Sequence, residues 1–224
     1  MRISIIIPVL NEAGQVAARM QALASLRADG AELLVADGGS IDGTAHLAAP
    51  FADRVLVGAL GRALQMNAGA DIASGEILLF LHADTTLPSG ALALIRQALS
   101  GSRHAWGRFD VAIDGRPRML KVIATMMNLR SRMTGIATGD QAIFVRRETF
   151  AAIGGYPPQA LMEDIELSRR LKRCTPPCCL RQRVVTSGRR WETRGVWRTI
   201  LLMWRLRWLY WRGVSPDKLA AVYR

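Results

Sequence analysis

Two carboxylates in this sequence, Asp84 and Asp164, have surroundings that suit chemistry. Asp84 belongs to residues 77–87, ILLFLHADTTL, which begin with a short apolar run typical of a strand buried on both faces of a parallel sheet. A carboxylate just past the carboxyl end of such a strand can hold Mg²⁺ or Mn²⁺ together with substrate phosphates. A turn in which Asp84 only caps the strand is an equally open interpretation.

Asp164 lies within residues 161–172, LMEDIELSRRLK, which predict a helix. On that helix Asp164 shares a face with three leucines, whereas Glu163 shares its face with other charged residues and is expected to be solvated. An inward carboxylate costs several kcal/mol unless it has a partner or a wet cavity. Asp164 is therefore half of a buried ion pair, the safer interpretation of the residue alone, or a group held at an active site, where a cavity wall would raise its pKa.

The elements that must position these carboxylates alternate between strand and helix in the first hundred residues. This rhythm predicts right-handed crossovers and a parallel sheet, followed after residue 106 by a mixed half. The predicted strands are residues 3–9, 32–36, 54–57, the run before His82, 106–113, 141–146 and 178–185; the predicted helices are residues 13–28, a segment ending near 73, 89–99, 117–134 and 161–172, with a basic loop at 186–191.

A cluster of glycines follows the second predicted strand, in residues 37–44, DGGSIDGT. Glycine lets the backbone approach a ligand closely. A plainer interpretation, in which Ser40 or Asp42 caps a short helix, is compatible with a ligand site.

Length, charge and cysteine content limit the kinds of protein that this chain can be. The chain has 224 residues, and its 30 Lys and Arg against 18 Asp and Glu give a net charge of +12. Such a surface attracts anions such as nucleotides, phosphates, nucleic acid or acidic lipid headgroups. Three cysteines form neither a disulfide framework nor a zinc site, and no signal peptide or run of about 18 apolar residues is visible. We therefore expect a cytoplasmic protein with no spanning helix.

The last part of the chain, residues 193–224, is expected to extend a single domain formed by residues 1–192. Tryptophans and one leucine form a stripe on its predicted helix, with arginines recurring every seven residues beside it. This pattern suits an amphipathic helix lying on an anionic bilayer, peripheral on the inner membrane face. Packing of the stripe on the protein's own core or in a homodimer is an equal alternative. The stripe consists of Trp197, Leu201, Trp204, Trp208 and Trp211.

Taken in order, these motifs resemble the family-two glycosyltransferases of the GT-A fold over residues 2–192. The motifs that carry the resemblance are SIIIPVLNE, DGGSIDGT, the N-x-G of residues 67–69, GEILLFLHAD, GD at 139–140, MEDIELSRRL and GRRW. More narrowly, DGGSIDGT, GRALQMNAGA, LLFLHADTTLP and the final LAAVYR resemble a bacterial subgroup assigned to arsenosugar biosynthesis. The resemblance implies an α/β fold with a Rossmann-like nucleotide-binding half and a mainly parallel mixed sheet, with helices on both faces.

The resemblance further implies transfer of a sugar, with inversion, from a nucleotide-diphosphate sugar to the hydroxyl of an unknown acceptor, assisted by Mn²⁺ or Mg²⁺. Asp164 would be the general base, and Asp84 with His82 would hold the metal. The positions matching the family's donor-binding residues are Pro8, Asn11, Glu12, Asp37, Arg62, Asn67, His82, Ala83, Asp140, Glu163, Arg190 and Trp191.

The sequence departs from the family pattern at two places. The usual pair of adjacent aspartates after the second strand is Asp37 and Gly38, and the usual D-x-D is His82-Ala83-Asp84. His82 could coordinate Mn²⁺, or it could bind ribose and leave Asp84 as the sole ligand. Loss of metal dependence is a third alternative.

Two other functions remain as alternatives. A non-catalytic basic protein that binds anionic membrane or nucleic acid would explain the charge, but not the ordered motifs. No RNA- or DNA-binding motif is visible, so we expect no nucleic-acid partner. A nucleotidylyltransferase would need a glycine-rich basic signature after the first strand, which VLNEAGQ does not provide.

Overall fold

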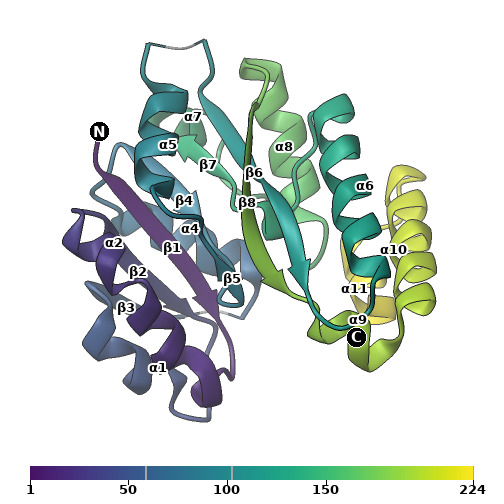
Figure 1. Ribbon diagram of the computed structural model, residues 1–224, viewed down its shortest axis with the longest axis horizontal. Helices are drawn as coiled ribbons and strands as arrows, with labels where there is room; N and C mark the ends of the chain where they lie inside the picture. The colour runs from purple at the N-terminus through teal and green to yellow at the C-terminus, as the bar shows by residue number, and fades with distance from the viewer. Residues whose placement is uncertain (59, 102, 224) are drawn as a thin grey trace.

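The computed structural model describes residues 1–58, 60–101 and 103–223. An eight-stranded sheet in the order β3-β2-β1-β4-β7-β6-β8-β5 forms its centre (Figure 1). The predicted α/β class with a mixed sheet is confirmed. The strands are β1 (Ile3–Val9), β2 (Glu32–Asp37), β3 (Arg54–Val57), β4 (Ile77–Phe80), β5 (Thr85–Thr86), β6 (Trp106–Asp114), β7 (Phe144–Arg146) and β8 (Cys178–Ser187).

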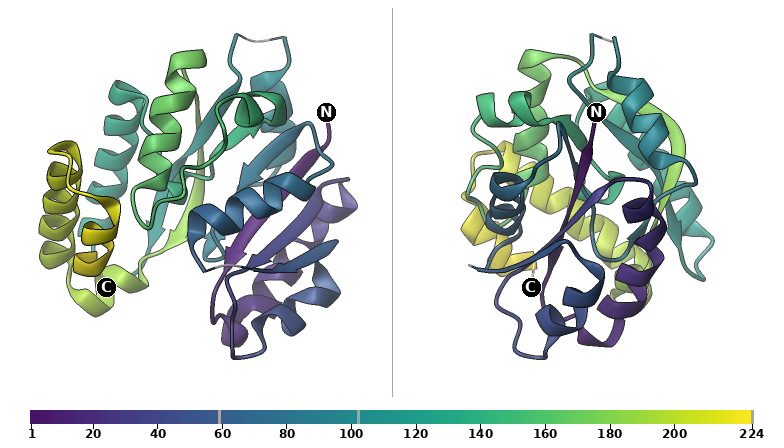
Figure 2. Two further views of the ribbon diagram at one scale, coloured as in Figure 1. Left: turned by 180° about the vertical axis from the view of Figure 1, so that it is seen from behind. Right: turned by 90° about the vertical axis from the view of Figure 1, so that its left-hand side faces the viewer.

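Helices cover both faces of the sheet (Figure 2). One apolar core lies under α1, α5 and α6, and a second lies under α4, α7 and α8. The helices are α1 (Ala13–Ala22), α2 (Ala24–Ala28), α3 (Thr44–Ala48), α4 (Arg62–Ile72), α5 (Ala91–Leu99), α6 (Met119–Thr134), α7 (Arg147–Ala152), α8 (Glu163–Cys174), α9 (Arg189–Arg194), α10 (Val196–Trp211) and α11 (Pro216–Tyr223), with 3-10 turns η1 (Ala49–Phe51) and η2 (Gly139–Gln141).

The sheet changes direction at the strand that precedes His82. Strands β3, β2, β1 and β4 are parallel, so their carboxyl ends meet at one edge. Strand β7 then runs antiparallel to β4, and β6 runs antiparallel to β7. All four residues of β4 are fully buried or nearly so, as its unbroken apolar run predicts. The residues that follow β4 therefore lie at the carboxyl edge of the sheet, where the parallel half meets the mixed half.

Several local predictions differ from the structure. Of the strand predicted for residues 141–146, only Phe144–Arg146 is a strand, and Gln141 belongs to η2. The single helix predicted for residues 13–28 is interrupted at Leu23. Thr85 and Thr86 form a separate short strand that pairs with β8, an interaction between distant segments that local pattern cannot report. The predicted loop at 186–191 is instead the end of β8 and the start of α9, joined through Gly188.

The carboxyl-terminal helices share a small core with the start of α8. Met162, Leu206 and Leu219 are its buried members. The tryptophan stripe of α10 does not belong to this core, because its four tryptophans are 55–78% exposed. Among the described residues, no helix is long and apolar enough to cross a membrane. Arg224, the last residue of the LAAVYR motif, lies outside the described residues.

Candidate functional site

The loops after β1 and β2 are joined by hydrogen bonds at the carboxyl edge of the sheet. The amide of Asn11 donates to Oγ of Ser40 at 2.8 Å, and the amide of Ile41 donates to Oδ1 of Asn11 at 3.1 Å. Ser40 in turn donates through its amide and hydroxyl to Oδ1 of Asp37. Within the described chain, Oδ2 of Asp37 is buried and has no hydrogen-bond partner. A ligand that donates a hydrogen bond would satisfy this oxygen.

Gly38, where the family has a second aspartate, lies against Gln65. A Cβ atom on Gly38 would be 3.0 Å from Cδ of Gln65. Gln65 cannot easily move, because its Nε2 donates to the carbonyls of Val9 and Ala36, each at 2.8 Å. The buried Gln65 therefore explains the glycine. The sequence analysis missed this role, since a glutamine on a helix carries no local signal of it.

His82 meets the short η2 segment just beyond the end of β4. Its Nδ1 lies 3.3 Å from Oδ1 of Asp140, and its Nε2 lies so close to Gly139 that a Cβ atom there would collide with it. Partial burial would raise the pKa of Asp140, but the hydrogen bond and charge of His82, with the charge of Arg62, lower it overall. Because both ring nitrogens face this segment, the geometry favours Asp84 over His82 as the metal ligand.

Asp164 is joined to the same segment. Its Oδ2 accepts a hydrogen bond from the amide of Gly139 at 2.9 Å, and its Oδ1 accepts one from the amide of Ile165 at 2.7 Å. Among the described residues Asp164 forms no ion pair, although Arg62 and Arg207 lie close enough for their charges to interact with it. This arrangement favours an active-site carboxylate over a structural ion pair.

The prediction that Glu163 is solvated is wrong. Glu163 is 4% exposed, and its Oε1 lies 3.6 Å from Nη1 of Arg62. Glu163 is the first residue of α8, and its side chain meets Arg62 on α4, a contact between distant segments that helical spacing cannot report. Burial and the neighbouring charge of Asp164 raise the pKa of Glu163, against the opposing effect of Arg62.

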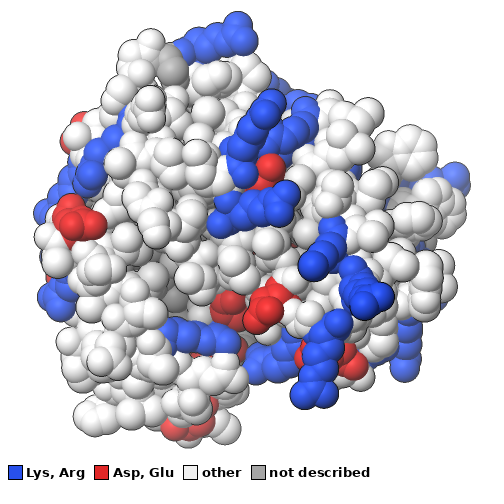
Figure 3. Space-filling model, viewed as in Figure 1, with Lys and Arg blue, Asp and Glu red and all other residues white. Residues whose placement is uncertain are grey.

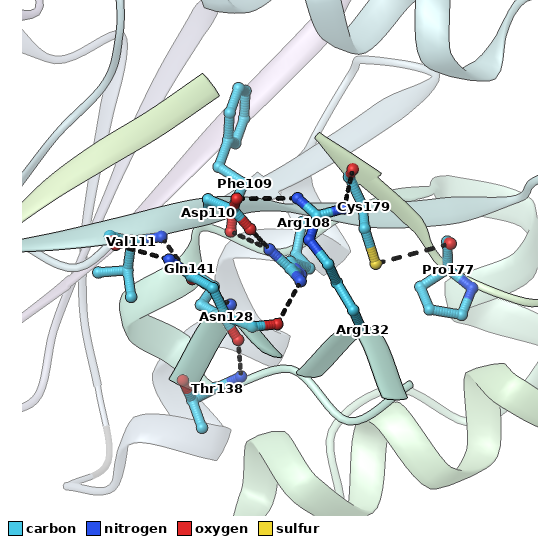
Figure 4. A network of polar contacts seen from close by, with 10 residues as sticks. All are labelled: Arg108, Phe109, Asp110, Val111, Asn128, Arg132, Thr138, Gln141, Pro177 and Cys179. Carbon is cyan, nitrogen blue, oxygen red and sulfur yellow. Dashed lines mark hydrogen bonds and ion pairs between the residues drawn. The ribbon is translucent and has the colours of Figure 1, made fainter. Parts of the chain in front are cut away.

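A buried polar network holds the η2 segment in place (Figure 4). The side chain of Asn128 pairs with both backbone groups of Val111 on β6, each at 2.9 Å. Its Oδ1 also accepts a hydrogen bond from Nε2 of Gln141 at 3.3 Å, and Gln141 Oε1 accepts one from the amide of Thr138. Arg108, fully buried beside this network, pairs with Asp110. Helix α6 and β6 thus fix the segment that contacts His82 and Asp164.

Asp84 lies in the turn that follows His82. That turn closes through a hydrogen bond from the amide of Thr85 to the carbonyl of His82 at 3.0 Å. His82, Ala83 and Asp84 line a cavity of about 500 Å³ between α1, α2 and residues 81–90, and Asp164 is outside its described lining. The contacts among the described residues connect the Asp84 turn to Asp164 through His82 and η2.

The donor set around Asp84 fits a cation that shares its coordination with substrate. Among the described residues, no cluster of three or more His, Cys, Asp or Glu is placed to hold a metal ion. Mg²⁺ and Mn²⁺ bound with nucleotide phosphates need only one or two protein carboxylates. Asp84, which is half-buried and has one long contact to Thr85 Oγ1 at 3.4 Å, can serve as such a ligand.

Asn67, which is predicted to contact the nucleotide, forms two hydrogen bonds with the backbone of Tyr156. Its Nδ2 donates to the carbonyl of Tyr156 and its Oδ1 accepts from the amide of Tyr156, both at 2.9 Å. Glu12 is held through its amide by Thr44 Oγ1 at 2.8 Å, close to the interlocked loops, and Pro8 lies near the carboxyl end of β1. Glu12 and Pro8 thus lie at the expected edge.

Arg190 and Trp191 lie on α9, and Arg190 contacts the end of the chain. Its guanidinium stacks over the ring of Tyr223 at 3.7 Å and donates to the Tyr223 carbonyl at 3.3 Å. The charges of Arg62 and Asp140 act on both Arg190 and Tyr223, which places α11 beside the site. Neither Tyr223 nor Arg207 was predicted as a site residue, and Arg207 lies outside the seven-residue arginine series.

A family model described as glycosyl transferase family 2 matches residues 4–154. The curated relatives include the PGL/p-HBAD biosynthesis glycosyltransferases of Mycobacterium tuberculosis and Mycobacterium bovis, 40% identical over 91 residues. This match covers 38% of the chain and 36% of each relative, so it spans about a third of their length.

Solved structures with a similar fold include mannosyltransferase PcManGT from Pyrobaculum calidifontis, in complex with GDP-Man and Mn²⁺. It has a TM-score of 0.65 and 19% identity, over 99% of this chain and 68% of that one. Glucosyl-3-phosphoglycerate synthase from Mycobacterium tuberculosis, with Mn²⁺, UDP and glucosyl-3-phosphoglycerate, has a TM-score of 0.60 and 20% identity, over 83% and 70%. S. aureus TarS 1-349 with UDP-GlcNAc has a TM-score of 0.63 and 15% identity, over 84% and 58%. At these identities the likeness concerns the fold.

Proposed function

Because the chain belongs to glycosyl transferase family 2, we propose that it transfers a sugar, with inversion, from a nucleotide-diphosphate sugar to an acceptor hydroxyl. The observation that carries the proposal is the meeting of His82, Asp140 and Asp164 around Gly139. These residues come from the loop after β4, from η2 and from α8, and they lie together at the carboxyl edge of the parallel strands. Ligands bind at that edge in open α/β sheets.

In this proposal the donor nucleotide lies across the loops after β1 and β2. The unpartnered Oδ2 of Asp37 accepts a hydrogen bond from its base or ribose. Among the described residues, those other than glycine with a positive φ are Asn11, Ala142 and Met162, and all three border the site. Strained backbone at such positions commonly accompanies function.

Asp164 is the proposed general base. It receives the proton of the acceptor hydroxyl as the oxygen attacks the anomeric carbon from the face opposite the leaving diphosphate. The amide of Gly139 fixes the direction of the carboxylate, and the charges of Arg62 and Arg207 favour anionic groups nearby. Orientation of this kind supplies much of the rate enhancement in transfer reactions.

Asp84 is the proposed protein ligand for a divalent cation, Mn²⁺ or Mg²⁺. Such a cation, when bound, neutralises negative charge developing on the leaving diphosphate. Arg62 and Arg190, coupled electrostatically across the site, would add positive charge to the same leaving group. The similar folds in complex with Mn²⁺ and GDP-Man, and with Mn²⁺ and UDP, support the proposal of a divalent cation.

The test is a panel of nucleotide sugars screened with Mn²⁺ and with Mg²⁺ for slow donor hydrolysis and for thermal stabilisation. We expect one donor to be hydrolysed and to raise the melting temperature. A non-catalytic basic protein would respond to no donor in either assay. The donor sugar found in this way would also test the assignment to the arsenosugar subgroup.

A further inference from the structure

The outward face of α10 carries large apolar side chains that the described chain leaves open to solvent. Trp197, Leu201, Trp204, Trp208 and Trp211 are each 55–78% exposed. The opposite face of the same helix buries Leu206 in the carboxyl-terminal core. The stripe is therefore not part of the protein's own core.

Helix α6 has a matching apolar row. Val122, Met126, Leu129 and Met133 recur at helical spacing and are each 50–77% exposed. The opposite side of α6 packs on the sheet. Exposed methionine and leucine on one helix would be ordinary singly, but two helices with such rows make an extended apolar surface. We refer to these nine side chains as the α6–α10 face.

The two helices adjoin at their inner flanks (Figures 1 and 2). Burial and the nearby charge of Arg207 on α10 lower the pKa of Arg130 on α6 to about 10. Nε and Nη2 of Arg130 are buried and have no hydrogen-bond partner within the described chain. The charge of Asp164 acts on both arginines. Arg130 and Arg207, where the two helices meet, therefore lie near the proposed base Asp164.

Basic side chains border the α6–α10 face. Lys121 on α6, and Arg198, Arg205 and Arg212 on α10, are exposed. Figure 3 shows Lys and Arg side chains over the part of the molecule that contains these helices, with others spread over the rest of this view. A second copy packed on this face would bring like charges together, whereas an anionic lipid surface complements them. Tryptophan also prefers the boundary between headgroups and acyl chains.

We propose that the α6–α10 face docks on an anionic lipid bilayer and that the acceptor is drawn from that bilayer, the second clause resting on the proposed function. A helix is about 10 Å across, so docking brings Asp164 within roughly one helix diameter of the headgroups. Arg130 and Arg207 then face the anionic group of an amphipathic acceptor whose hydroxyl reaches Asp164. The acceptor class is a membrane-resident amphiphile with a negatively charged headgroup.

The experiment measures sedimentation of the full chain with vesicles of phosphatidylcholine alone or with about 30% phosphatidylglycerol, at low and high salt. We expect binding to the anionic vesicles, weakened at high salt. Two double variants are compared with the unchanged chain: one combines Trp204→Ser with Trp208→Ser, and the other combines Met126→Ser with Leu129→Ser. Each should weaken binding to the anionic vesicles by about tenfold or more. Val57→Ser, which changes a 67% exposed residue on the distant strand β3, is the matched control and should bind as the unchanged chain does.

Three outcomes overturn docking: equal sedimentation of the serine variants and the control, binding indifferent to lipid charge, or a lipid-free dimer that the serine substitutions dissociate. Donor hydrolysis without vesicles, measured on the same proteins, separates the two proposals. Vesicle binding without hydrolysis of any donor would keep the docking face and remove the sugar-transfer proposal. Hydrolysis of a donor without vesicle binding would keep the sugar-transfer proposal and remove the docking face.

Discussion

The amide of Gly139 donates a hydrogen bond to Oδ2 of Asp164, at 2.9 Å, and so joins η2 to the first turn of α8. These segments are 25 residues apart in the chain. Because the ring of His82 packs on the other side of Gly139, one glycine lies between the end of β4 and the proposed base. A side chain at this position would separate them.

Asp164→Asn is expected to lower sugar transfer by about a hundredfold or more, since a neutral amide cannot accept the proton of the acceptor. Donor binding, measured by calorimetry, should change little. Ser168→Ala is the matched control, because Ser168 Oγ holds the amide of Ala137 before the same segment at 3.0 Å but carries no charge. If Asp164→Asn retains full activity, Asp164 is not the base.

Asp84→Ala is expected to lower the affinity for nucleotide in the presence of Mn²⁺ by about tenfold or more, because the cation loses its protein carboxylate. Most of the gain in affinity that Mn²⁺ gives the unchanged chain should therefore be lost. His82→Phe should keep the Mn²⁺ effect, since both nitrogens of His82 face η2. Asp71→Ala, at an exposed carboxylate on α4, is the control for a simple loss of charge. A Mn²⁺ titration of nucleotide binding that is the same for Asp84→Ala and Asp71→Ala would count against the metal assignment.

Gly38→Ala is expected to destabilise the fold by about 1 kcal/mol, because the new Cβ meets Gln65 and Gln65 is held by two carbonyls. Gln65→Ala alone should also destabilise it, since the carbonyls of Val9 and Ala36 lose their donor. The double variant should be more stable than the sum of the two changes predicts, because the alanine at 65 removes the contact. Urea unfolding of the four proteins measures this coupling, and additive effects would rule out the explanation for the glycine.

Much of the fold followed from local pattern, for physical reasons. A buried parallel strand such as β4 must be apolar on both faces, so its end and the position of Asp84 could be predicted. The convergence of His82, Asp140 and Asp164 could be predicted only through the order of family motifs, because no local rule specifies contacts across 58 residues.

The rest depended on tertiary contacts. Glu163 was assigned to solvent because helical spacing groups it with Glu166 and Arg170, whereas its burial comes from its contact with Arg62 on α4. Gln65 and Tyr223 act through distant backbone groups and an arginine, and neither contact leaves a periodic trace in the sequence. The tryptophan stripe of α10 could be predicted from its helical spacing. Whether another element packs on the stripe could not, because this depends on α8 and α11, which pack on the opposite face of α10.

The raised pKa of Glu163 predicts how stability depends on pH. Burial, followed by the charge of Asp164, makes the folded state hold a proton on Glu163 more tightly than the unfolded state does. Stability from this group is therefore present at low pH and is lost as pH rises from about 4.5 through the raised pKa. Glu163→Gln removes this loss, so its unfolding free energy relative to the unchanged chain should improve as pH increases.

Chemical unfolding from pH 4 to pH 8 tests this prediction, at about half-unit steps so that the slope with pH can be compared between proteins. Glu166→Gln is the matched control on α8, because Glu166 is more exposed and pairs with Arg169 and Arg170 at the surface. A pH-dependent difference shared by both variants would be a general effect of removing a carboxylate from α8. A Glu163→Gln difference that is flat over this range would mean that Arg62 compensates fully for the buried charge, and the raised pKa would have to be abandoned.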